Sequence, residues 1–233
     1  MYLWRIPYST YGGLMARAAP GTHEAVIELL HSVSVPREAP VLDLAAGTGA
    51  LLSRLSAEGF SHLQAVERDV EHFGFHNVQP LALDLNASFS SQLPSRSFRL
   101  ITAIEIIEHL DSPRAFLQEI QKALAPNGYA IISTPNVAHW LGRIQFLLTG
   151  ELKFFTAQDF HDQRHISPLL DHHMRIHIEE MGFELMQTQT TASSWGLFIR
   201  LLTLPISLLF RLTKGPNTDG NINLYLIRKK SSS

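Results

Sequence analysis

Val41-Leu-Asp-Leu-Ala-Ala-Gly-Thr-Gly-Ala-Leu-Leu-Ser-Arg-Leu55 is the stretch from which the fold of this chain can be inferred. It begins with the apolar residues of a buried strand, turns through Gly47 and Gly49, and continues as a helix with a leucine-rich face. The two glycines allow the backbone to turn sharply and to approach a ligand without intervening side chains. The first amides of the helix would point at that ligand. The stretch therefore predicts a strand–turn–helix unit that binds a nucleotide or a related molecule.

Two acidic residues narrow the choice of ligand. A dinucleotide fingerprint needs a third glycine where this chain has Leu52, and no Gly-Lys-Ser/Thr follows to hold phosphates. Asp43 would repel a pyrophosphate and attract a cation. Glu67 ends a second predicted strand at about the spacing at which such folds place a carboxylate on ribose hydroxyls. A positively charged nucleoside with a ribose diol and no phosphate fits both acids, and S-adenosylmethionine is such a molecule.

With these motifs the chain resembles the class I S-adenosylmethionine-dependent methyltransferases over residues 38–136. Asp43, Gly47 and Gly49 match the first motif of that family, and Glu67 matches its ribose-binding acid. The resemblance departs at Ala45, where the family usually has glycine, so the backbone there is expected to lie slightly further from the methionine part of the cofactor. The predicted cofactor-binding residues are Asp43, Ala45, Gly47, Gly49, Glu67, Arg68, Asp84, Leu85 and Glu105, together with Tyr11 from the N-terminal arm described below.

Composition bounds the class of protein. The chain has 233 residues, of which 45% are hydrophobic and 17% charged, with a net charge of −2 and no cysteine. This composition predicts a globular protein without disulfides or thiol catalysis, and gives no electrostatic argument for nucleic acid binding. The N-terminus lacks the layout of a signal peptide, and no stretch has the roughly 18 apolar residues of a membrane-spanning helix. We therefore expect a cytoplasmic enzyme with a small-molecule substrate.

Strand and helix patterns alternate along the chain, which predicts a parallel sheet with helices on both faces. The expected strands are 41–45, 62–66, 79–83, 98–104, 129–133, 183–190 and 221–228. The first expected helix begins after an N-cap at Thr22. The further expected helices cover 49–58, 70–74, 112–125, 138–148 and 167–182. The resemblance implies an α/β fold, a Rossmann-like three-layer sandwich whose mostly parallel seven-stranded sheet has an antiparallel last strand.

The whole chain, residues 1–233, is expected to form a single methyltransferase domain. Residues 1–36 are interpreted as an N-terminal arm and helix, with Tyr8 and Tyr11 placed to touch the cofactor. Residues 137–182 and 191–215 are interpreted as insertions on the substrate side.

Catalysis is expected after the strand at 98–104, in Glu105-Ile-Ile-Glu108-His109. Residues three and four apart share a face of a helical turn, so Glu105, Glu108 and His109 are the candidate catalytic residues. His109 as general base is favoured over a metal site, for which His161 and His165 could supply further ligands to Mg²⁺, Mn²⁺ or Fe²⁺. The small-RNA 2′-hydroxyl methyltransferases and some ubiquinone-pathway O-methyltransferases have a similar motif. Arg143 and Arg164 are candidates for holding an anionic substrate group.

The most apolar stretch, residues 197–210, has three interpretations: ordinary core or a dimer contact, an oily lid over the substrate, or a peripheral membrane contact at the inner face of the membrane. Together with a histidine base, this apolar stretch favours O-methylation of an apolar or amphipathic acceptor. Two alternatives stay open, a catalytically silent S-adenosylmethionine-binding partner subunit and a metal-assisted 2′-hydroxyl methyltransferase. A nicotinamide oxidoreductase is disfavoured by Asp43 and Leu52.

Overall fold

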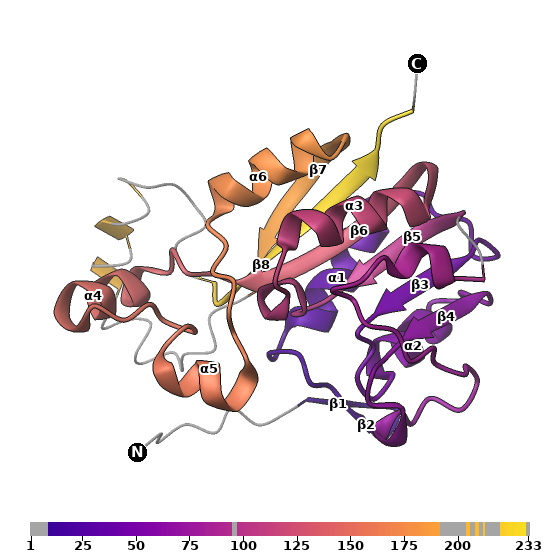
Figure 1. The fold of residues 1–233 in the computed structure, drawn as a ribbon, viewed down its shortest axis with the longest axis horizontal. Helices are drawn as coiled ribbons and strands as arrows, with labels where there is room; N and C mark the ends of the chain where they lie inside the picture. The colour runs from indigo at the N-terminus through magenta and orange to yellow at the C-terminus, as the bar shows by residue number, and fades with distance from the viewer. Residues whose placement is uncertain are drawn as a thin grey trace.

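The centre of the protein is a twisted sheet with helices on both faces (Figure 1). The computed structural model describes residues 9–94, 97–191 and 220–231, with residues 204, 205, 208, 209 and 212. The strands of the sheet are β3 (Val41–Leu44), β4 (Leu63–Val66), β5 (Phe98–Ala103), β6 (Leu124–Pro135), β7 (Phe183–Thr190) and β8 (Ile222–Lys229). Their order is β4-β3-β5-β6-β8-β7; β8 runs antiparallel to both of its neighbours, β6 and β7, whereas the pairs among β4, β3, β5 and β6 are parallel. The predicted antiparallel last strand is confirmed.

The helices begin and end at recognisable signals. They are α1 (Thr22–His31), α2 (Ala50–Ala57), α3 (Pro113–Ala123), α4 (Trp140–Thr149), α5 (Ala157–Gln163) and α6 (Asp171–Glu180). The hydroxyl of Ser112 accepts a hydrogen bond from the amide of Ala115 and Pro113 is the first residue of α3, as the sequence predicts. Helix α4 ends at Gly150, whose left-handed conformation favours glycine.

The two faces of the sheet bury different apolar residues because successive side chains of a strand point to opposite sides. On β3, Leu42 and Leu44 pack in the cluster that includes α3 and α6, whereas Val41 packs in the cluster of α1 and α2. On β8, Tyr225 and Leu224 divide in the same way. The protein is therefore a three-layer sandwich, as predicted, and the strands are apolar on both faces because both are covered.

The segment predicted as a strand at 79–83 was assigned wrongly. Only Leu81 pairs, in a single parallel bridge with Val66, so the described part of the sheet has six strands rather than seven. Pro80 has no amide hydrogen to donate, which limits pairing at this edge of the sheet.

Three helix predictions also need correction. The N-cap of α1 is Gly21, and Thr22 is the first helical residue. Helix α6 begins at Asp171 rather than near Ser167, because the Ser167 hydroxyl donates to the carbonyl of Leu110 and does not cap the helix. The 70–74 segment is a 3-10 turn, η1 (Val70–His72).

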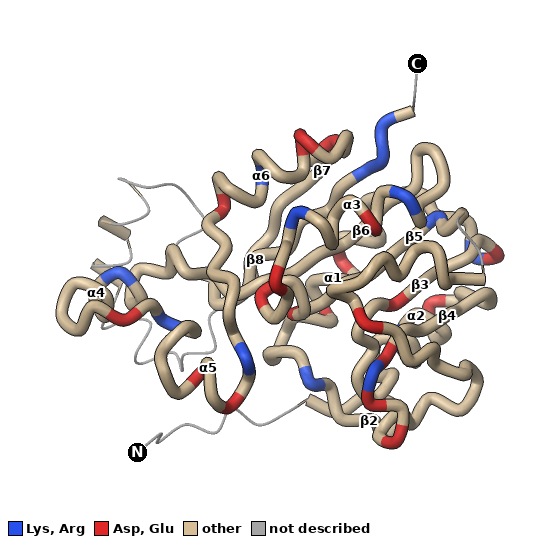
Figure 2. The backbone as a smooth tube through the Cα atoms, in the orientation of Figure 1, with Lys and Arg blue, Asp and Glu red and all other residues tan. Residues whose placement is uncertain are grey.

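Helices α4 and α5 lie beyond the carboxyl ends of the parallel strands, whereas α6 returns to cover the sheet (Figure 1). A two-stranded hairpin, β1 (Thr10–Tyr11) and β2 (Leu14–Met15), precedes α1. Lys and Arg are scattered among Asp and Glu along the chain (Figure 2). In the described part of the chain, every helix is too short or too polar to cross a bilayer. Ligands of parallel sheets bind at the carboxyl ends of the strands, which is the edge beyond which α4 and α5 lie.

Candidate functional site

The turn after β3 forces the backbone into left-handed conformations. Ala45, Gly47 and Gly49 have φ angles of 56°, 58° and 84°. A Cβ on Gly49 would lie 2.5 Å from the Cβ of Phe75, so only glycine fits there. Ala45 adopts the conformation that favours glycine although it carries a Cβ, at a cost of about 1–2 kcal/mol. The backbone of the turn therefore has the conformation expected of glycine at Ala45, although the side chain there differs from that of the family.

Two buried carboxylates lie beside this turn. Asp43 is 2% exposed and accepts a hydrogen bond of 2.6 Å from the hydroxyl of Thr102. Burial, with a smaller contribution from Glu67, raises the pKa of Asp43 to about 7. Glu67 accepts from the amides of Gly47, at 2.6 Å, and Asp69, at 2.9 Å. Each carboxylate oxygen of Glu67 keeps a further lone pair that could accept a hydroxyl hydrogen.

The other predicted cofactor residues lie in different surroundings. Leu85 is buried in the core, whereas Asp84 and Arg68 are exposed. The carboxylate of Asp84 accepts from the amide of Asn86. The ring of Tyr11 packs against Arg54 of α2, with the guanidinium carbon 4.5 Å from the ring centroid. Tyr8 lies outside the described residues. The structure thus brings Asp43, Ala45, Gly47, Gly49 and Glu67 together, and their role in binding the cofactor stays a prediction.

Glu105 does not point at Glu108, contrary to the expected shared face. The predicted helical turn is a 3-10 turn, η3 (Ile107–His109), that begins after Glu105. Glu105 itself has a φ of 50°, and its amide donates to the hydroxyl of Ser133 at 2.9 Å. Its carboxylate accepts from the amide of Ala19, at 2.9 Å, and the hydroxyl of Thr22, at 3.0 Å. The side chain of Glu105 is therefore directed at the beginning of α1.

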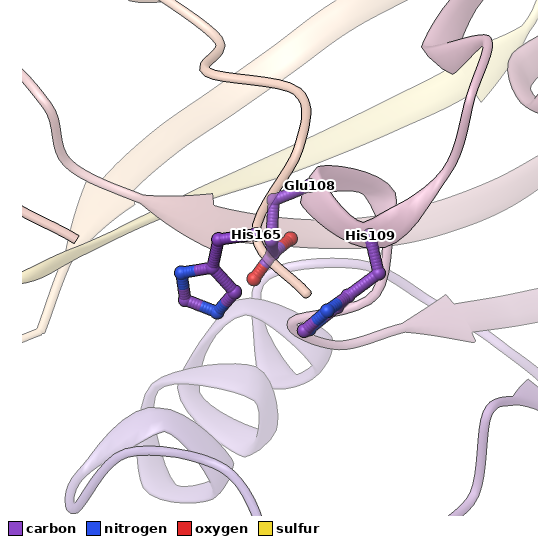
Figure 3. Close-up of side chains that lie close together, drawn as sticks. All are labelled: Glu108, His109 and His165. Carbon is purple, nitrogen blue, oxygen red and sulfur yellow. The ribbon is translucent and has the colours of Figure 1, made fainter. Parts of the chain in front are cut away.

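Glu108, His109 and His165 form a cluster in which their potential ligand atoms all lie within 4.8 Å of one another. Figure 3 shows the carboxylate of Glu108 between the two imidazoles. Glu108 is fully buried, and within the described part of the chain its carboxylate oxygens have no hydrogen-bond partner. Burial raises the pKa of Glu108 well above its usual range. Burial and the neighbouring His165 lower the pKa of His109. His161, on α5, is exposed and is not in this cluster.

The orientation of His165 is fixed by the backbone. Its Nδ1 lies 2.6 Å from the carbonyl oxygen of Phe154, which can only accept, so Nδ1 carries the hydrogen. In the neutral ring, Nε2 then has the free lone pair. An imidazole held by a backbone carbonyl in this way is common in metal sites, and one carboxylate with two imidazoles suits a divalent transition-metal ion. The cluster can therefore serve either as an acid–base group or as a cation site.

One residue at this edge was missed from the sequence. Lys153 is partly buried, and its ammonium donates to the side-chain oxygen of Asn221 at 2.8 Å. A single lysine within the mostly apolar stretch 152–155 was the available signal. Neither predicted arginine matches it: Arg143 donates to the carbonyl of Ala138, and Arg164 is exposed beside Phe160.

The six-stranded arrangement with β8 inserted between β6 and β7, and the glycine turn after β3, define the class I methyltransferase fold. A S-adenosylmethionine-dependent methyltransferase from Archaeoglobus fulgidus superposes on this chain with a TM-score of 0.61 at 18% identity, covering 90% of this chain and 95% of that one. A family model described as a methyltransferase domain matches residues 17–188. The chain belongs to this family of methyltransferase domains.

The relatives include ubiquinone biosynthesis O-methyltransferases. One from Rickettsia akari is 28% identical over 130 residues, which cover 53% of this chain and 52% of that protein. A mitochondrial one from Dictyostelium discoideum is 30% identical over 130 residues, which cover 49% of this chain and 40% of that protein. The chain thus spans about half or less of the length of these relatives.

Proposed function

We propose that the protein transfers the methyl group of S-adenosylmethionine to a hydroxyl of a small acceptor. The observation that carries this proposal is the pair of buried carboxylates, Asp43 and Glu67, beside a glycine turn at the carboxyl ends of β3 and β4. Asp43 provides negative charge for a cationic ligand, and Glu67 provides acceptors for the ribose diol. Methyl transfer is a displacement at a carbon already activated by the sulfonium, so the protein mainly aligns the nucleophile and removes its proton.

The cluster of Glu108, His109 and His165 is assigned to the acceptor end of the site. Because burial and His165 lower the pKa of His109, its ring is neutral near pH 7 and can accept the hydroxyl proton. Glu108 lies close to the ring, since ligand atoms of the two residues are within 4.8 Å of each other. Its ionised form, which burial disfavours while His109 is neutral, would stabilise the imidazolium that forms. Glu105 is then a positioning residue, since its carboxylate binds the beginning of α1.

A second candidate is metal-assisted transfer to a hydroxyl, including the 2′-hydroxyl of a ribose. The cluster itself favours it, because the two buried oxygens of Glu108 have no partner among the described residues and His165 is oriented by the carbonyl of Phe154. Glu108, His109 and His165 would hold the ion, which would help to ionise the acceptor hydroxyl. Equilibrium dialysis with Mn²⁺ distinguishes the two candidates: stoichiometric binding that Glu108→Gln abolishes favours the metal.

An apolar or amphipathic acceptor is the class that we favour. The relatives are named as enzymes of ubiquinone biosynthesis, and their acceptors are therefore candidates here. Of the apolar stretch 197–210, residues 197–203, 206, 207 and 210 lie outside the described residues, whereas Leu208 and Leu209 are exposed. This exposure supports a peripheral membrane contact, a lid or a dimer contact over ordinary core.

Calorimetry with S-adenosylmethionine and S-adenosylhomocysteine tests the proposal directly. We expect both to bind and Glu67→Ala to weaken binding about ten- to a hundredfold, because hydrogen bonds to a charged group are lost. Glu71→Ala, an exposed acid nearby, is the control. Absence of binding by both ligands refutes the proposal. Binding without turnover over a panel of hydroxylated acceptors favours the catalytically silent partner subunit.

A further inference from the structure

Arg17, in the segment between β2 and α1, contacts two parts of the proposed cofactor site. Its guanidinium pairs with the carboxylate of Asp69, in the segment after β4, at 3.3 Å. A Cβ on Gly47 would lie 3.4 Å from the Cδ of Arg17, so the aliphatic part of this side chain packs on the glycine turn after β3. Arg17 therefore joins the glycine turn to the segment after β4.

Glu67 joins the same two segments. One of its carboxylate oxygens accepts from the amide of Gly47 at 2.6 Å, and the other accepts from the amide of Asp69 at 2.9 Å. The contacts of Arg17 and Glu67 thus form a closed ring that runs through Gly47 and Asp69. Because each oxygen of Glu67 is held by a different segment, the orientation of this carboxylate depends on how far apart the two segments lie.

The backbone on both sides of Arg17 is fastened. The carbonyl of Met15, two residues before it, accepts from the hydroxyl of Thr48 in the glycine turn at 2.8 Å. The amide of Ala19, two residues after it, donates to the carboxylate of Glu105 at 2.9 Å. These two hydrogen bonds fix the path of the chain over the turn, so the side chain of Arg17 starts from a defined position.

The ion pair itself is exposed. The side chains of Arg17 and Asp69 are 46% and 41% exposed, and exposed pairs contribute little to folding stability. Asp69 is ionised at neutral pH, because hydrogen bonds from His72 and Arg17 lower its pKa. Loss of this pair should therefore leave the fold intact, and its effect should appear in the geometry of the site beside it.

We propose that Arg17 is a positioning residue of the cofactor site, which holds the glycine turn and the Asp69 segment at the separation at which Glu67 can accept from both hydroxyls of a ribose. Arg17 acts through Glu67 and does not itself touch the cofactor. The ligands that benefit are nucleosides with a free ribose diol. This inference rests on the proposed function, because it concerns the same cofactor site.

Calorimetry with S-adenosylhomocysteine and with 5′-methylthioadenosine tests this role, because the second ligand has the same adenosine and lacks the amino-acid part. Arg17→Met keeps an aliphatic stem and removes the charge, and it should weaken both ligands by the same factor, at least about threefold. Arg17→Lys keeps a cation that can pair with Asp69 and should retain the wild-type affinity. Arg114→Met is the control, because it removes an exposed arginine that pairs with Glu180 on α6. It should bind both ligands like the wild type.

A double-mutant cycle shows whether Arg17 acts through Glu67. In the Glu67→Ala background, Arg17→Met should cause no further loss of affinity. Asp69→Asn, whose amide still donates to Glu67, should cause a loss of the same size as Arg17→Met.

Three outcomes overturn the inference and leave the proposed function standing. The first is unchanged affinity for both ligands in Arg17→Met. The second is a further loss in the Glu67→Ala background. The third is a loss for S-adenosylhomocysteine alone, which would mean that Arg17 binds the amino-acid part directly. If the wild type binds neither ligand, the proposed function fails and the inference fails with it.

Discussion

Two residues with side chains adopt left-handed conformations directly after neighbouring strands. Ala45 follows β3 with a φ of 56°, and Glu105 lies just after β5 with a φ of 50°. Such residues cost free energy and gather at functional sites, where the surrounding structure enforces them. Their position at the carboxyl ends of the two strands agrees with the place assigned to the cofactor.

Ala45→Gly should stabilise the protein. Glycine removes the steric cost of the left-handed conformation, about 1–2 kcal/mol. It also loses more conformational entropy on folding than alanine, which offsets about 0.5–1 kcal/mol of this gain. We expect the free energy of unfolding in urea to rise by about 0.5–1 kcal/mol. Ala46→Gly is the control, because Ala46 does not have a positive φ, and it should destabilise the protein. A loss of stability in both variants would contradict the strain at Ala45.

Asp43 should release a proton when the cofactor binds. Its pKa is raised to about 7, so part of it is protonated near neutral pH, and a nearby sulfonium favours the ionised form. Calorimetric enthalpies of S-adenosylmethionine binding at pH 6.5 should therefore vary with the ionisation enthalpy of the buffer. Asp43→Asn should abolish this dependence and weaken binding. Enthalpies that are identical in all buffers for the wild type would contradict the prediction.

The same carboxyl affects stability in the absence of cofactor. The pKa of Asp43 is raised in the folded state, so as pH rises the carboxyl ionises in the unfolded chain first. The contribution of Asp43 to the free energy of unfolding is therefore complete below about pH 4 and is lost as the pH rises to about 7. Asp43→Asn keeps an oxygen that can accept from Thr102, so it should remove this loss and gain about 1–4 kcal/mol relative to the wild type at pH 8.

At the level of elements, Glu105 connects the segment after β5 to the beginning of α1. Its carboxylate accepts from Ala19 and Thr22, in the manner of a cap supplied from a distant part of the chain. Glu105→Ala should lower the free energy of unfolding by about 1–3 kcal/mol and increase proteolysis before α1. Glu105→Gln retains an acceptor oxygen and should be close to the wild type in both measurements. If Glu105→Gln is stable but loses turnover, Glu105 has the catalytic role that the sequence indicates.

The elements that were predicted well carry strong local signals. Strands β3 and β5 are runs of apolar residues, and α3 begins at Ser112-Pro113, a cap followed by a favourable first residue. Helix α5 was missed because it is short and has little apolar period, although the capping box of Thr156 and Asp159 marks its beginning.

The parts that could not be predicted depend on long-range contacts. The direction of the Glu105 carboxylate is set by α1, 83 residues away along the chain at Thr22. The meeting of His165 with Glu108 and His109 follows from the path of the segment between α5 and α6. Spacing within one motif indicates which residues share a turn, but not which distant segment packs against it.

At the level of the whole molecule, exposed apolar side chains gather at the end that carries α4. Phe146, Leu147 and Leu148 are 51%, 82% and 77% exposed, and the described leucines of residues 204–212 are also exposed. The double variant Leu147→Gln/Leu148→Gln should keep its fold and lose more than about tenfold in affinity for anionic liposomes, because burying each leucine is worth about 1.5–3 kcal/mol.

Ile176→Gln on α6, also exposed, is the matched control and should bind liposomes like the wild type. Sedimentation velocity of the same variants separates the alternatives. A wild-type dimer that the double variant converts to monomer would assign the α4 surface to a contact between two copies. Liposome binding that is unchanged in the double variant would rule out α4 as the membrane contact.

The position of β8 has a consequence for how the protein acquires its structure. β8 follows β7 in the chain but separates β7 from β6, so the sheet cannot grow by adding strands in the order of synthesis. Until residues 222–229 have left the ribosome, β6 presents an apolar edge with unpaired amides, and β7 has no neighbour in the sheet. Pairings between such distant residues form slowly, and an exposed edge invites association with other chains. The rate at which β8 inserts should therefore decide how much of the newly made protein escapes aggregation.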